Sequence, residues 1–530
     1  MSITGKLYIN GEWVKGKAGS YQPVNPATME KIGPEMTMAS ADQVDAAVLA
    51  AEAAAPLFRQ TSLEQRAAFL NACADEIMEL GEALVRRVSE ETGYPAGRGE
   101  MERGRTCNQL RLMADTIVKG DFLDARIDTA MPDRVPVPRP DLRSVNQAIG
   151  PVVVFGASNF PLAFSVAGGD TAAALAAGCP VLVKGHSSHP GTCELVAQAM
   201  ARAAEKCDMP KGVFSLLMGA GAQVGAALVK APAVKAVGFT GSFAGGMALV
   251  KMANARPEPI PVFAEMGSIN PVVLLPKALQ ADAQGIAEGF VGSLTLGTGQ
   301  FCVNPGLVIA MDDDGLRDFL EAAGEIVSNT EAGVMLNERI CNAYDEGMEN
   351  FLNESGVDLL AAGDDTVDAQ GYCAQANLLL TTASNFLDNP QIHEEIFGPT
   401  SLVVKCKDIW DILAVMNALK GQLTGTVHAA EGELAEYAEL MDLLSQKVGR
   451  IVINGFPTGV EVCHAMVHGG PFPASTDSRF TSVGTSAIDR FVRPVCFQNY
   501  PVDLLPDALR NSNPLKLSRL VNGEHNSGSL

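Results

Sequence analysis

The sequence predicts an α/β fold in which parallel β-sheets are covered by helices. Three observations support this class. The chain has 530 residues, too many for one ordinary hydrophobic core, which indicates two or three domains. It is 47% hydrophobic and 19% charged, which is a globular composition. From Pro151 onward, short apolar runs alternate with helical segments, as in parallel strands joined by crossover helices.

The residues before Pro151 have a different pattern. Residues 7–14, LYINGEWV, predict a short strand or two, followed by turns rich in Gly, Pro and Asn. From about Ala41 to Ile117 apolar residues recur three and four positions apart, which predicts helices. Residues 131–150, MPDRVPVPRPDLRSVNQAIG, hold four prolines and several charges. Because proline cannot donate within a central strand, this segment is predicted to be an edge ribbon or a connector that leaves the domain body.

Four apolar runs after Pro151 predict strands: VVVF, VLVK, VFSLL and VKAVGF. Between them we expect a small-residue helix ending at Gly178, a helix from Thr192 to Glu205 and a helix after Ala222. Sheets of this kind bind ligands at the carboxyl ends of their strands. A second alternating region runs from about Val262 to Val452. The chain then continues to a polar tail, NGEHNSGSL, which we expect to fray.

Charge and cysteine content limit the expected partners and compartment. The formal net charge is −22, from 61 acidic and 39 basic residues, which disfavours nucleic acid and anionic membranes as partners. The 11 cysteines include no CxxC pair, which indicates reduced thiols. The sequence MSITGKLYINGEW lacks a charged head followed by an apolar run, and no apolar stretch reaches about 18 residues. We therefore expect a cytoplasmic protein without a membrane segment.

Three positions are candidates for catalytic chemistry, and each has a plainer alternative. Cys302 lies in GQFCVNPG, where flanking glycines permit close approach of a ligand, but most cysteines are buried structural residues. Glu265, in FAEMGSINP, follows a strand-like run and is a possible general base or an ordinary ion-paired glutamate. Asn159, in GASNFP, offers an amide donor for an oxyanion, or is a simple turn residue.

Further positions are candidates for binding a nucleotide cofactor. Lys184, at the end of the second predicted strand, would offer a cation to ribose or phosphate. Gly241 and Ser242, in GFTGS, open a predicted helix whose first amides would face a phosphate. GAGAQVG, which contains Gly221 and Gly225, is spaced one residue off the usual dinucleotide fingerprint and is weak alone.

The joint arrangement of these motifs is more informative than any single one. NFP, a strand-end lysine, GFTGS, EMGSINP and GQFC follow one another in order, and EEIFGP and INGFPTG come later in the chain. Together they resemble the aldehyde dehydrogenase superfamily over about residues 5–510. The resemblance implies a Rossmann-like cofactor domain, an α/β catalytic domain and a small β oligomerisation element. The expected bounds are 1–130 and 151–262 for the NAD(P)-binding domain, 263–475 for the catalytic domain, 131–150 and 476–510 for the oligomerisation element, and 511–530 for the tail.

The resemblance also implies a role for each candidate residue. Cys302 would be the nucleophile that forms a thioester, Glu265 the base for the deacylating water, and Asn159 an oxyanion donor together with the backbone N–H of Cys302. Lys184 and Glu395 would hold the two cofactor riboses. The other residues expected along the cofactor are Phe155, Gly156, Ser187, Gly221, Gly225, Gly241, Ser242 and Phe397.

Cofactor preference is predicted from a departure at Ser187. Many NAD-preferring members of the family carry an acidic residue three positions after the strand-end lysine, and a carboxylate there would repel a 2′-phosphate. Serine removes that repulsion, and His186 or Lys184 could assist. This favours NADP, while NAD remains open.

Substrate class is predicted from further departures. The motif EMGS in place of ELGG, Ser158 before the asparagine, and MVHGGPFPAST near the C-terminus resemble the 2-oxoglutarate semialdehyde (2,5-dioxopentanoate) dehydrogenase subgroup. An NADP-dependent fatty-aldehyde dehydrogenase is similar in the same segments and remains the alternative. A substrate carboxylate requires a cation, for which Arg105 and Arg111 are candidates beside Phe160; six positions apart, only one arginine is expected to point inward.

The remaining expectations concern rival functions, metals and assembly. A CoA-acylating enzyme is disfavoured by Glu265, which suits hydrolysis, and a non-catalytic protein has no need of all three catalytic candidates. His464 and His468 are four residues apart, but the following Gly-Gly-Pro argues against a helical metal site, and we expect no metal. The resemblance implies a homodimer or homotetramer that acts on a small-molecule aldehyde.

Overall fold

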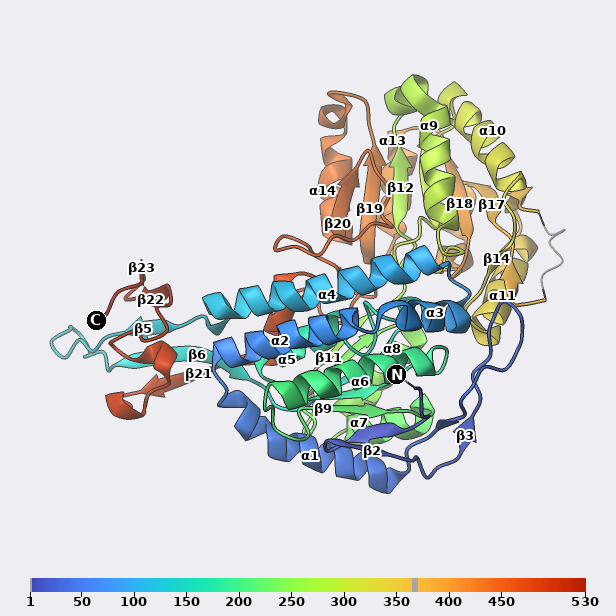
Figure 1. Cartoon of the computed structure of the whole chain (residues 1–530). Helices are drawn as coiled ribbons and strands as arrows, with labels where there is room; N and C mark the ends of the chain where they lie inside the picture. The colour runs from blue at the N-terminus through green and yellow to red at the C-terminus, as the bar shows by residue number, and fades with distance from the viewer. Residues whose placement is uncertain (1, 365–369) are drawn as a thin grey trace.

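The computed structural model of the chain describes residues 2–364 and 370–530. Two lobes are each built around a seven-stranded sheet, and a third, five-stranded sheet forms an arm that projects from one end of the molecule (Figure 1). The predicted α/β class is confirmed, since helices cover both large sheets. None of the helices in the described residues is long and apolar enough to span a membrane.

The sheet of the first lobe has the strand order β11-β10-β7-β8-β9-β1-β2. All four predicted strands after Pro151 are present and parallel, and the N-terminal hairpin extends the edge of the sheet. The strands are β1 (Leu7–Ile9), β2 (Glu12–Val14), β7 (Val152–Phe155), β8 (Val181–Lys184), β9 (Phe214–Leu217), β10 (Ala236–Thr240) and β11 (Val262–Glu265). From β7 the sheet grows to β8 and β9 on one side and to β10 and β11 on the other. In sheets of this kind, ligands are expected at the carboxyl ends of the two strands where the order reverses, here β7 and β10.

Helices cover both faces of this sheet, as the periodic pattern from Ala41 predicted. They are α1 (Ala41–Arg59), α2 (Leu63–Met78), α3 (Gly81–Thr92), α4 (Ala96–Lys119), α5 (Gly169–Ala177), α6 (Pro190–Lys206), α7 (Ala226–Lys230) and α8 (Phe243–Asn254). The helix expected after Ala222 starts as one π-turn, η2 (Gly221–Gly225). Helix α2 packs against α4 and α6, and α4 runs along the side that faces the second lobe (Figure 1).

Local sequence determines where these helices begin and end. Ser62 and Gln65 form a capping box at the start of α2, since the Gln65 backbone N–H donates to Ser62 Oγ and the Ser62 backbone N–H donates to Gln65 Oε1. Every residue of α5 is buried, which its alanines permit because they allow close packing. Gly178, with φ 96°, ends α5 in the left-handed region as predicted.

The sheet of the second lobe has the strand order β15-β17-β18-β13-β12-β19-β20, and only β15 is antiparallel to its neighbour. Its strands are β12 (Pro271–Leu274), β13 (Leu307–Met311), β15 (Asp358–Ala362), β17 (Asn377–Thr382), β18 (Thr400–Cys406), β19 (Gln422–His428) and β20 (Val448–Ile453). Its helices are α9 (Pro276–Thr295), α10 (Asp314–Ser328), α11 (Glu338–Asn353), α12 (Ala383–Asp388), α13 (Ile409–Ala418) and α14 (Ala438–Lys447). One apolar cluster fills each face of this sheet.

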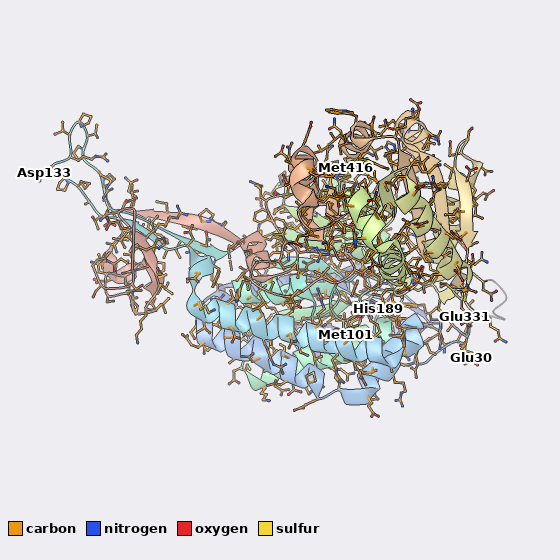
Figure 2. All side chains as sticks on the ribbon, turned by 90° about the horizontal axis from the view of Figure 1, so that it is seen from above. Glu30, Met101, Asp133, His189, Glu331 and Met416 are labelled. Carbon is orange, nitrogen blue, oxygen red and sulfur yellow. The ribbon has the colours of Figure 1, made fainter. Side chains whose placement is uncertain are left out.

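The arm contains the strand order β21-β6-β5-β22-β23. The strands are β5 (Arg126–Asp128), β6 (Leu142–Ala148), β21 (Val492–Gln498), β22 (Arg519–Val521) and β23 (Glu524–Asn526). The proline-rich segment leaves the body of the protein as predicted, and Asp133 lies at the tip of the arm (Figure 2). The expected edge position is wrong for β6, which pairs with β21 on one side and β5 on the other; the prolines of the segment all precede this strand.

The C-terminal end of the chain corrects one expectation. Residues 511–530 were expected to form a frayed tail, but β22 pairs with β5, β23 pairs with β22, and Leu517 and Val521 are buried in the core of the arm. The arm also includes β5, before its expected start at residue 131. By contrast, Thr476, expected in the arm, pairs with Ala264 in the first lobe. The remaining short strands are β3 (Ser20–Tyr21), β4 (Met36–Thr37), β14 (Gly333–Val334) and β16 (Cys373–Ala374).

Candidate active site

Cys302 lies on a tight loop between α9 and β13, and its side chain is partly accessible. Gly299 makes this loop possible. Its φ is +63°, and a Cβ at this position would lie 2.3 Å from the backbone of Gly398. The flanking glycine is therefore required by the backbone, and the loop presents Cys302 where a ligand can reach it.

Asn270 holds the Cys302 loop in place. Its Nδ2 donates to the carbonyl oxygens of Cys302 and Asn304, each at 2.9 Å. Its Oδ1 accepts from the hydroxyl of Thr424 at 2.9 Å. Asn270 is fully buried, so these bonds replace the water that the loop carbonyls would otherwise need.

Asn159 approaches the same loop from the first lobe. It lies after β7, is buried, and its Nδ2 donates to the carbonyl oxygen of Gln300 at 3.0 Å. One amide hydrogen is used in that bond, and the second is available to another acceptor. The structure thus brings Asn159 to the loop of Cys302, as the oxyanion-donor prediction requires.

Glu265 and a histidine complete the group around the thiol. Glu265 is the last residue of β11, at the strand end where it was expected. Its Oε2 lies 2.9 Å from Nε2 of His468, and the two side chains are only 3% and 1% exposed. The same Nε2 lies 3.5 Å from Sγ of Cys302. A thiol, an imidazole and a carboxylate therefore converge on one point.

The electrostatics of this point work against a free thiolate. Burial raises the pKa of the Cys302 thiol well above its ordinary value, and the negative charges of Glu265 and Glu395 raise it further. Arg105 acts in the opposite direction. Since the thiolate is the nucleophilic form, the site needs a group that removes the proton during attack.

Aromatic side chains and one arginine form the wall beside the thiol. Phe160 stacks edge to face on Phe301, with ring centroids 5.1 Å apart, and both pack near Cys302. Arg105, on α4, lies over the ring of Phe164 and close enough to influence Cys302. Burial lowers the pKa of the Arg105 guanidinium, which remains a cation at neutral pH.

Arg111 is not part of this wall. It forms an ion pair with Asp75 at 2.9 Å on a largely exposed surface of the first lobe. Of the two arginines predicted for a substrate carboxylate, the structure therefore brings only Arg105 to the site. This agrees with the expectation that one of them points inward.

Phe155 and Gly156 lie at the carboxyl end of β7, and Gly241 and Ser242 lie at the carboxyl end of β10. Phe155 ends β7, and a Cβ on Gly225 would lie 2.8 Å from the Phe155 ring, so glycine allows the π-turn to approach the strand. Ser242 caps α8, where its Oγ accepts the backbone N–H of Gly245 at 3.2 Å. Gly241 precedes this cap, and a helix N-terminus such as that of α8 favours a phosphate.

Lys184 provides an observation that fits an oxygen-rich ligand. It ends β8 and is buried, yet its ammonium makes no hydrogen bond or ion pair with any residue that the structure describes. Burial lowers the pKa of this amine. Ser187 is exposed on the turn that follows, and His186 lies beside it. A buried cation without a partner fits the hydroxyl or phosphate oxygens of a nucleotide.

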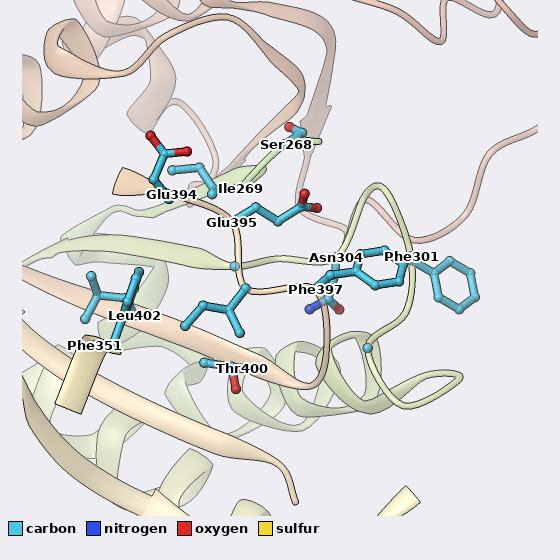
Figure 3. A pocket seen from close by; sticks show the side chains of 13 residues that line it. Ser268, Ile269, Phe301, Asn304, Phe351, Glu394, Glu395, Phe397, Thr400 and Leu402 are labelled. Atoms are coloured by element: carbon cyan, nitrogen blue, oxygen red, sulfur yellow. The ribbon is translucent and has the colours of Figure 1, made fainter. Parts of the chain in front are cut away.

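Glu395 and Phe397 lie in the second lobe, shortly before β18. They line a pocket with Ser268 and residues of the Cys302 loop, and Figure 3 shows the Glu395 carboxylate extending toward Ser268. Burial raises the pKa of Glu395 to about 8, against a hydrogen bond from the Ser268 backbone. The residues expected to hold a dinucleotide thus come from both lobes, and their joint role in binding it stays a prediction.

Three residues of the site were not identified from the sequence. His468 was considered only as a helical metal ligand; it lies instead on an irregular segment, while His464 is exposed and bonds to Thr485. Asn270 and Gln300 sit inside recognised motifs, but nothing local distinguishes them from neighbouring polar residues. Their roles depend on contacts with distant parts of the chain.

The side chains of Glu265, Cys302 and His468 lie close enough together to hold a metal ion, although we expect none. The ligand atoms of Glu265, Cys302 and His468 all lie within 4.8 Å of one another. Carboxylate, thiolate and imidazole are the ligands that Zn²⁺ prefers. The absence of a metal in the native protein therefore stays a prediction.

Comparison with known proteins identifies the family to which the sequence is similar. The model of the aldehyde dehydrogenase family matches residues 13–488. An α-ketoglutaric semialdehyde dehydrogenase of Azospirillum brasilense is 52% identical over 99% of this chain and 100% of its own length. Another, from Acinetobacter baylyi, is 47% identical over 98% of both chains.

Solved structures show the same fold at lower identity. The crystal structure of a betaine aldehyde dehydrogenase from Staphylococcus aureus, in complex with NAD⁺, matches with a TM-score of 0.80 at 22% identity, over 94% of this chain and 96% of that one. A 1-pyrroline-5-carboxylate dehydrogenase from Thermus with bound NAD also gives a TM-score of 0.80 at 22% identity, over 93% and 92% of the two chains.

Proposed function

The chain belongs to the aldehyde dehydrogenase family and oxidises an aldehyde to a carboxylic acid with NAD(P), and from this premise we propose that its substrate is 2-oxoglutarate semialdehyde. The observation that carries the proposal is full-length similarity to two relatives named for that substrate. Arg105 adds chemical support, because a cation beside the thiol suits a substrate that carries a carboxylate.

In the proposed mechanism, Cys302 attacks the aldehyde carbon and Asn159 stabilises the oxygen that becomes negative. The Asn159 amide is positioned by its bond to Gln300, so the second amide hydrogen and the backbone N–H of Cys302 can serve as donors. A nicotinamide cofactor held beside Cys302 would supply the oxidant, as the acceptor of a hydride. Glu265 then activates the water that hydrolyses the thioester and releases the acid.

The cofactor would lie at the carboxyl ends of β7 and β10 and reach the second lobe. Lys184 and Glu395 would hold the two riboses, Phe397 would pack near the nicotinamide, and the amides after Gly241 would face the pyrophosphate. We propose a preference for NADP, because exposed Ser187 leaves no carboxylate to repel a 2′-phosphate. Replacement Ser187→Glu should weaken binding of NADP more than binding of NAD.

We propose a separate role for each part of the chain. Residues 1–130 and 151–262 would bind NAD(P), residues 263–475 would carry the nucleophile, and the arm would serve oligomerisation. Glu265 falls within the range 263–475 proposed for the catalytic domain. In the structure, however, it is the last residue of β11 and so belongs to the sheet of the first lobe. It therefore stands at the junction where the two lobes form the site.

The test is the initial rate of NAD(P)H formation by the purified protein with 2-oxoglutarate semialdehyde and with a medium-chain fatty aldehyde, each with NAD and NADP. We expect the semialdehyde to be preferred and Cys302→Ala to be inactive. Arg105→Gln should raise KM for the semialdehyde, while Arg111→Gln, the matched surface control, should not. Preference for the fatty aldehyde would contradict the substrate proposal, and formation of acyl-CoA on addition of CoA would contradict hydrolysis by Glu265.

A further inference from the structure

His468 is buried against the nucleophile, yet neither the motifs nor the proposed mechanism gives it a role. Its Nε2 lies 3.5 Å from Sγ of Cys302 and 2.9 Å from Oε2 of Glu265. The residue is separated from Cys302 by 166 positions in the sequence. A titratable side chain at van der Waals distance from a nucleophilic sulfur is a candidate participant in the reaction, whichever aldehyde is the substrate.

The fold fixes the position of this ring. The backbone N–H of His468 donates to the Thr481 hydroxyl at 2.8 Å, and its carbonyl accepts the N–H and hydroxyl of Ser482 at 2.8 and 3.0 Å. The ring packs at a tilt on Phe164, with centroids 6.0 Å apart. Its Nδ1 has no hydrogen-bond partner among the described residues, so Nε2 is the nitrogen directed at polar atoms.

The thiol needs such a neighbour because its surroundings favour the protonated form. A carboxylate next to a thiol opposes formation of a second negative charge, so Glu265 alone does not activate Cys302. His468 contacts both groups, which changes the balance: once Nε2 takes the thiol proton, the resulting cation lies 2.9 Å from the Glu265 carboxylate and 3.5 Å from the sulfur. Cysteine nucleophiles are commonly activated by a histidine whose orientation a third group supports.

We propose that His468 is a catalytic residue that accepts the proton of Cys302 as the thiol attacks the aldehyde, with Glu265 stabilising the imidazolium. The S–H bond breaks and its proton moves to the lone pair of Nε2. The sulfur electron pair forms the C–S bond, and the π pair of the carbonyl moves to the oxygen beside Asn159. The transfer uses the tautomer that carries its proton on Nδ1, and the proton passes to water when the cycle closes.

The inference can be tested without any substrate, so its outcome is independent of the proposed aldehyde. We would measure the rate of Cys302 alkylation by iodoacetamide from pH 5.5 to 10, in the presence of EDTA, with the modified peptide quantified by mass spectrometry. The full chain would be compared with His468→Gln and His468→Asn. His464→Gln is the matched control, since His464 is an exposed histidine four residues away.

We expect both His468 variants to shift the inflection of alkylation upward by about one pH unit or more, which is a tenfold loss of thiolate at pH 7. His464→Gln should match the unmodified chain. Retained NADP binding and an unchanged far-UV spectrum would show that the variants are folded. The same inflection in folded His468 variants and in the unmodified chain would overturn the proposal.

Chemical rescue gives a second, independent readout. His468→Gly leaves space for a small base beside the sulfur, and added imidazole should then restore alkylation at pH 7, while it should have no effect on His464→Gly. A residue that only supports the fold would not respond to imidazole in this way. Failure of imidazole to raise the rate in a folded His468→Gly protein would count against a base at this position.

Discussion

At the scale of single residues, replacement of Asn159 should lower the rate of turnover without changing how readily the Cys302 thiol ionises. Its amide lies near Cys302 but carries no charge that would stabilise a thiolate. We expect Asn159→Ala to lower kcat by about 10²–10³-fold, because one oxyanion donor is lost. The rate of Cys302 alkylation should stay unchanged. Steady-state assays and alkylation on the same samples measure both quantities.

The control for Asn159 is Tyr94→Phe. The Tyr94 hydroxyl donates to the backbone oxygen of Asn159 at 3.3 Å. Its removal therefore changes a contact of Asn159 but leaves the side-chain amide of Asn159 in place. We expect kcat to change by less than about threefold in this variant, in line with the modest value of one hydrogen bond. An Asn159→Ala protein with normal kcat would exclude the oxyanion role.

Glu395 predicts how cofactor affinity depends on pH. Burial raises the pKa of its carboxyl to about 8, so in the cofactor-free protein the group is mostly protonated below pH 8 and ionised above it. Ribose hydroxyls bind best to the ionised form, which accepts two hydrogen bonds. Affinity for NADP should therefore rise as pH increases from 6.5 to 9, by up to about tenfold per pH unit below 8.

The measurement is the Kd of NADP by fluorescence titration in a Cys302→Ala background, which removes ionisation of the thiol from the same pH range. Glu395→Gln keeps the size of the side chain and lacks the titration, so its Kd should be weaker and independent of pH. A slope that persists in Glu395→Gln would assign the effect to another group.

The sequence indicated three of the catalytic candidates but not His468, for a physical reason. Cys302, Glu265 and Asn159 stand at strand ends or glycine turns, where local sequence indicates an accessible position. His468 lies on an irregular segment, and only tertiary folding places it beside a cysteine 166 residues away. Pairwise proximity of this kind leaves no pattern in a single sequence. For the same reason, the sequence does not distinguish Arg105 from Arg111 as the substrate-binding residue. The packing of α4 does, because it places only Arg105 near Cys302.

At the scale of elements, the start of α6 depends on one buried carboxylate. Glu91, on α3, accepts the backbone N–H groups of Gly191 and Thr192, each at 2.8 Å, and forms an ion pair with Arg87 at 2.9 Å. It thereby satisfies two free donors of a helix N-terminus and joins α3 to α6. The turn between Lys184, at the end of β8, and α6 therefore ends at a helix start that Glu91 holds.

We expect Glu91→Ala to lower the free energy of unfolding by about 3–5 kcal/mol, because buried Arg87 would lose its closest carboxylate and two helix N–H groups would lose their acceptor. Glu90→Ala is the matched control: this neighbouring, partly exposed glutamate pairs with Arg86 and Arg87 only at 3.8 and 3.5 Å. Its loss should cost less than about 1 kcal/mol. Urea unfolding of both variants measures the difference, and equal costs would contradict the assignment of Glu91 as the cap.

Most elements could be predicted because their hydrophobic period matches their structure. The buried strands from β7 to β10 are continuous apolar runs, and helices α1–α4 carry apolar residues at helical spacing. Strands β22 and β23 were missed because they lie in a small sheet with little core, where main-chain pairing needs few apolar side chains. Composition alone therefore indicated a tail in place of a pair of strands.

At the scale of the whole molecule, the site exists only where the two lobes meet. Asn159, Glu265 and Lys184 come from the first sheet, while Cys302 and Glu395 come from the second lobe. The sequence order of the motifs indicated which residues act, but not which distances separate them. Those distances follow from the docking of two sheets, each of which is complete without the other.

The edges of the second sheet predict where a second copy binds. Strand β20 pairs only with β19 among the described strands, and its Ile451 and Ile453 are 37% and 41% exposed. The arm projects on the side of the molecule where β20 lies (Figure 1). An unpaired strand edge beside apolar side chains favours association, and a twofold axis would give each copy the same contact.

We expect the double variant Ile451→Asp, Ile453→Asp to sediment as a smaller species than the unmodified chain, because burial of two carboxylates at an interface is unfavourable. The matched control is Leu360→Asp on β15, at the opposite edge of the same sheet, where the side chain is 40% exposed. Its mass should not change. Analytical ultracentrifugation measures the assemblies. If the double variant kept the full mass while Leu360→Asp dissociated, the interface would lie at the β15 edge, and the role assigned to the arm would fail with it.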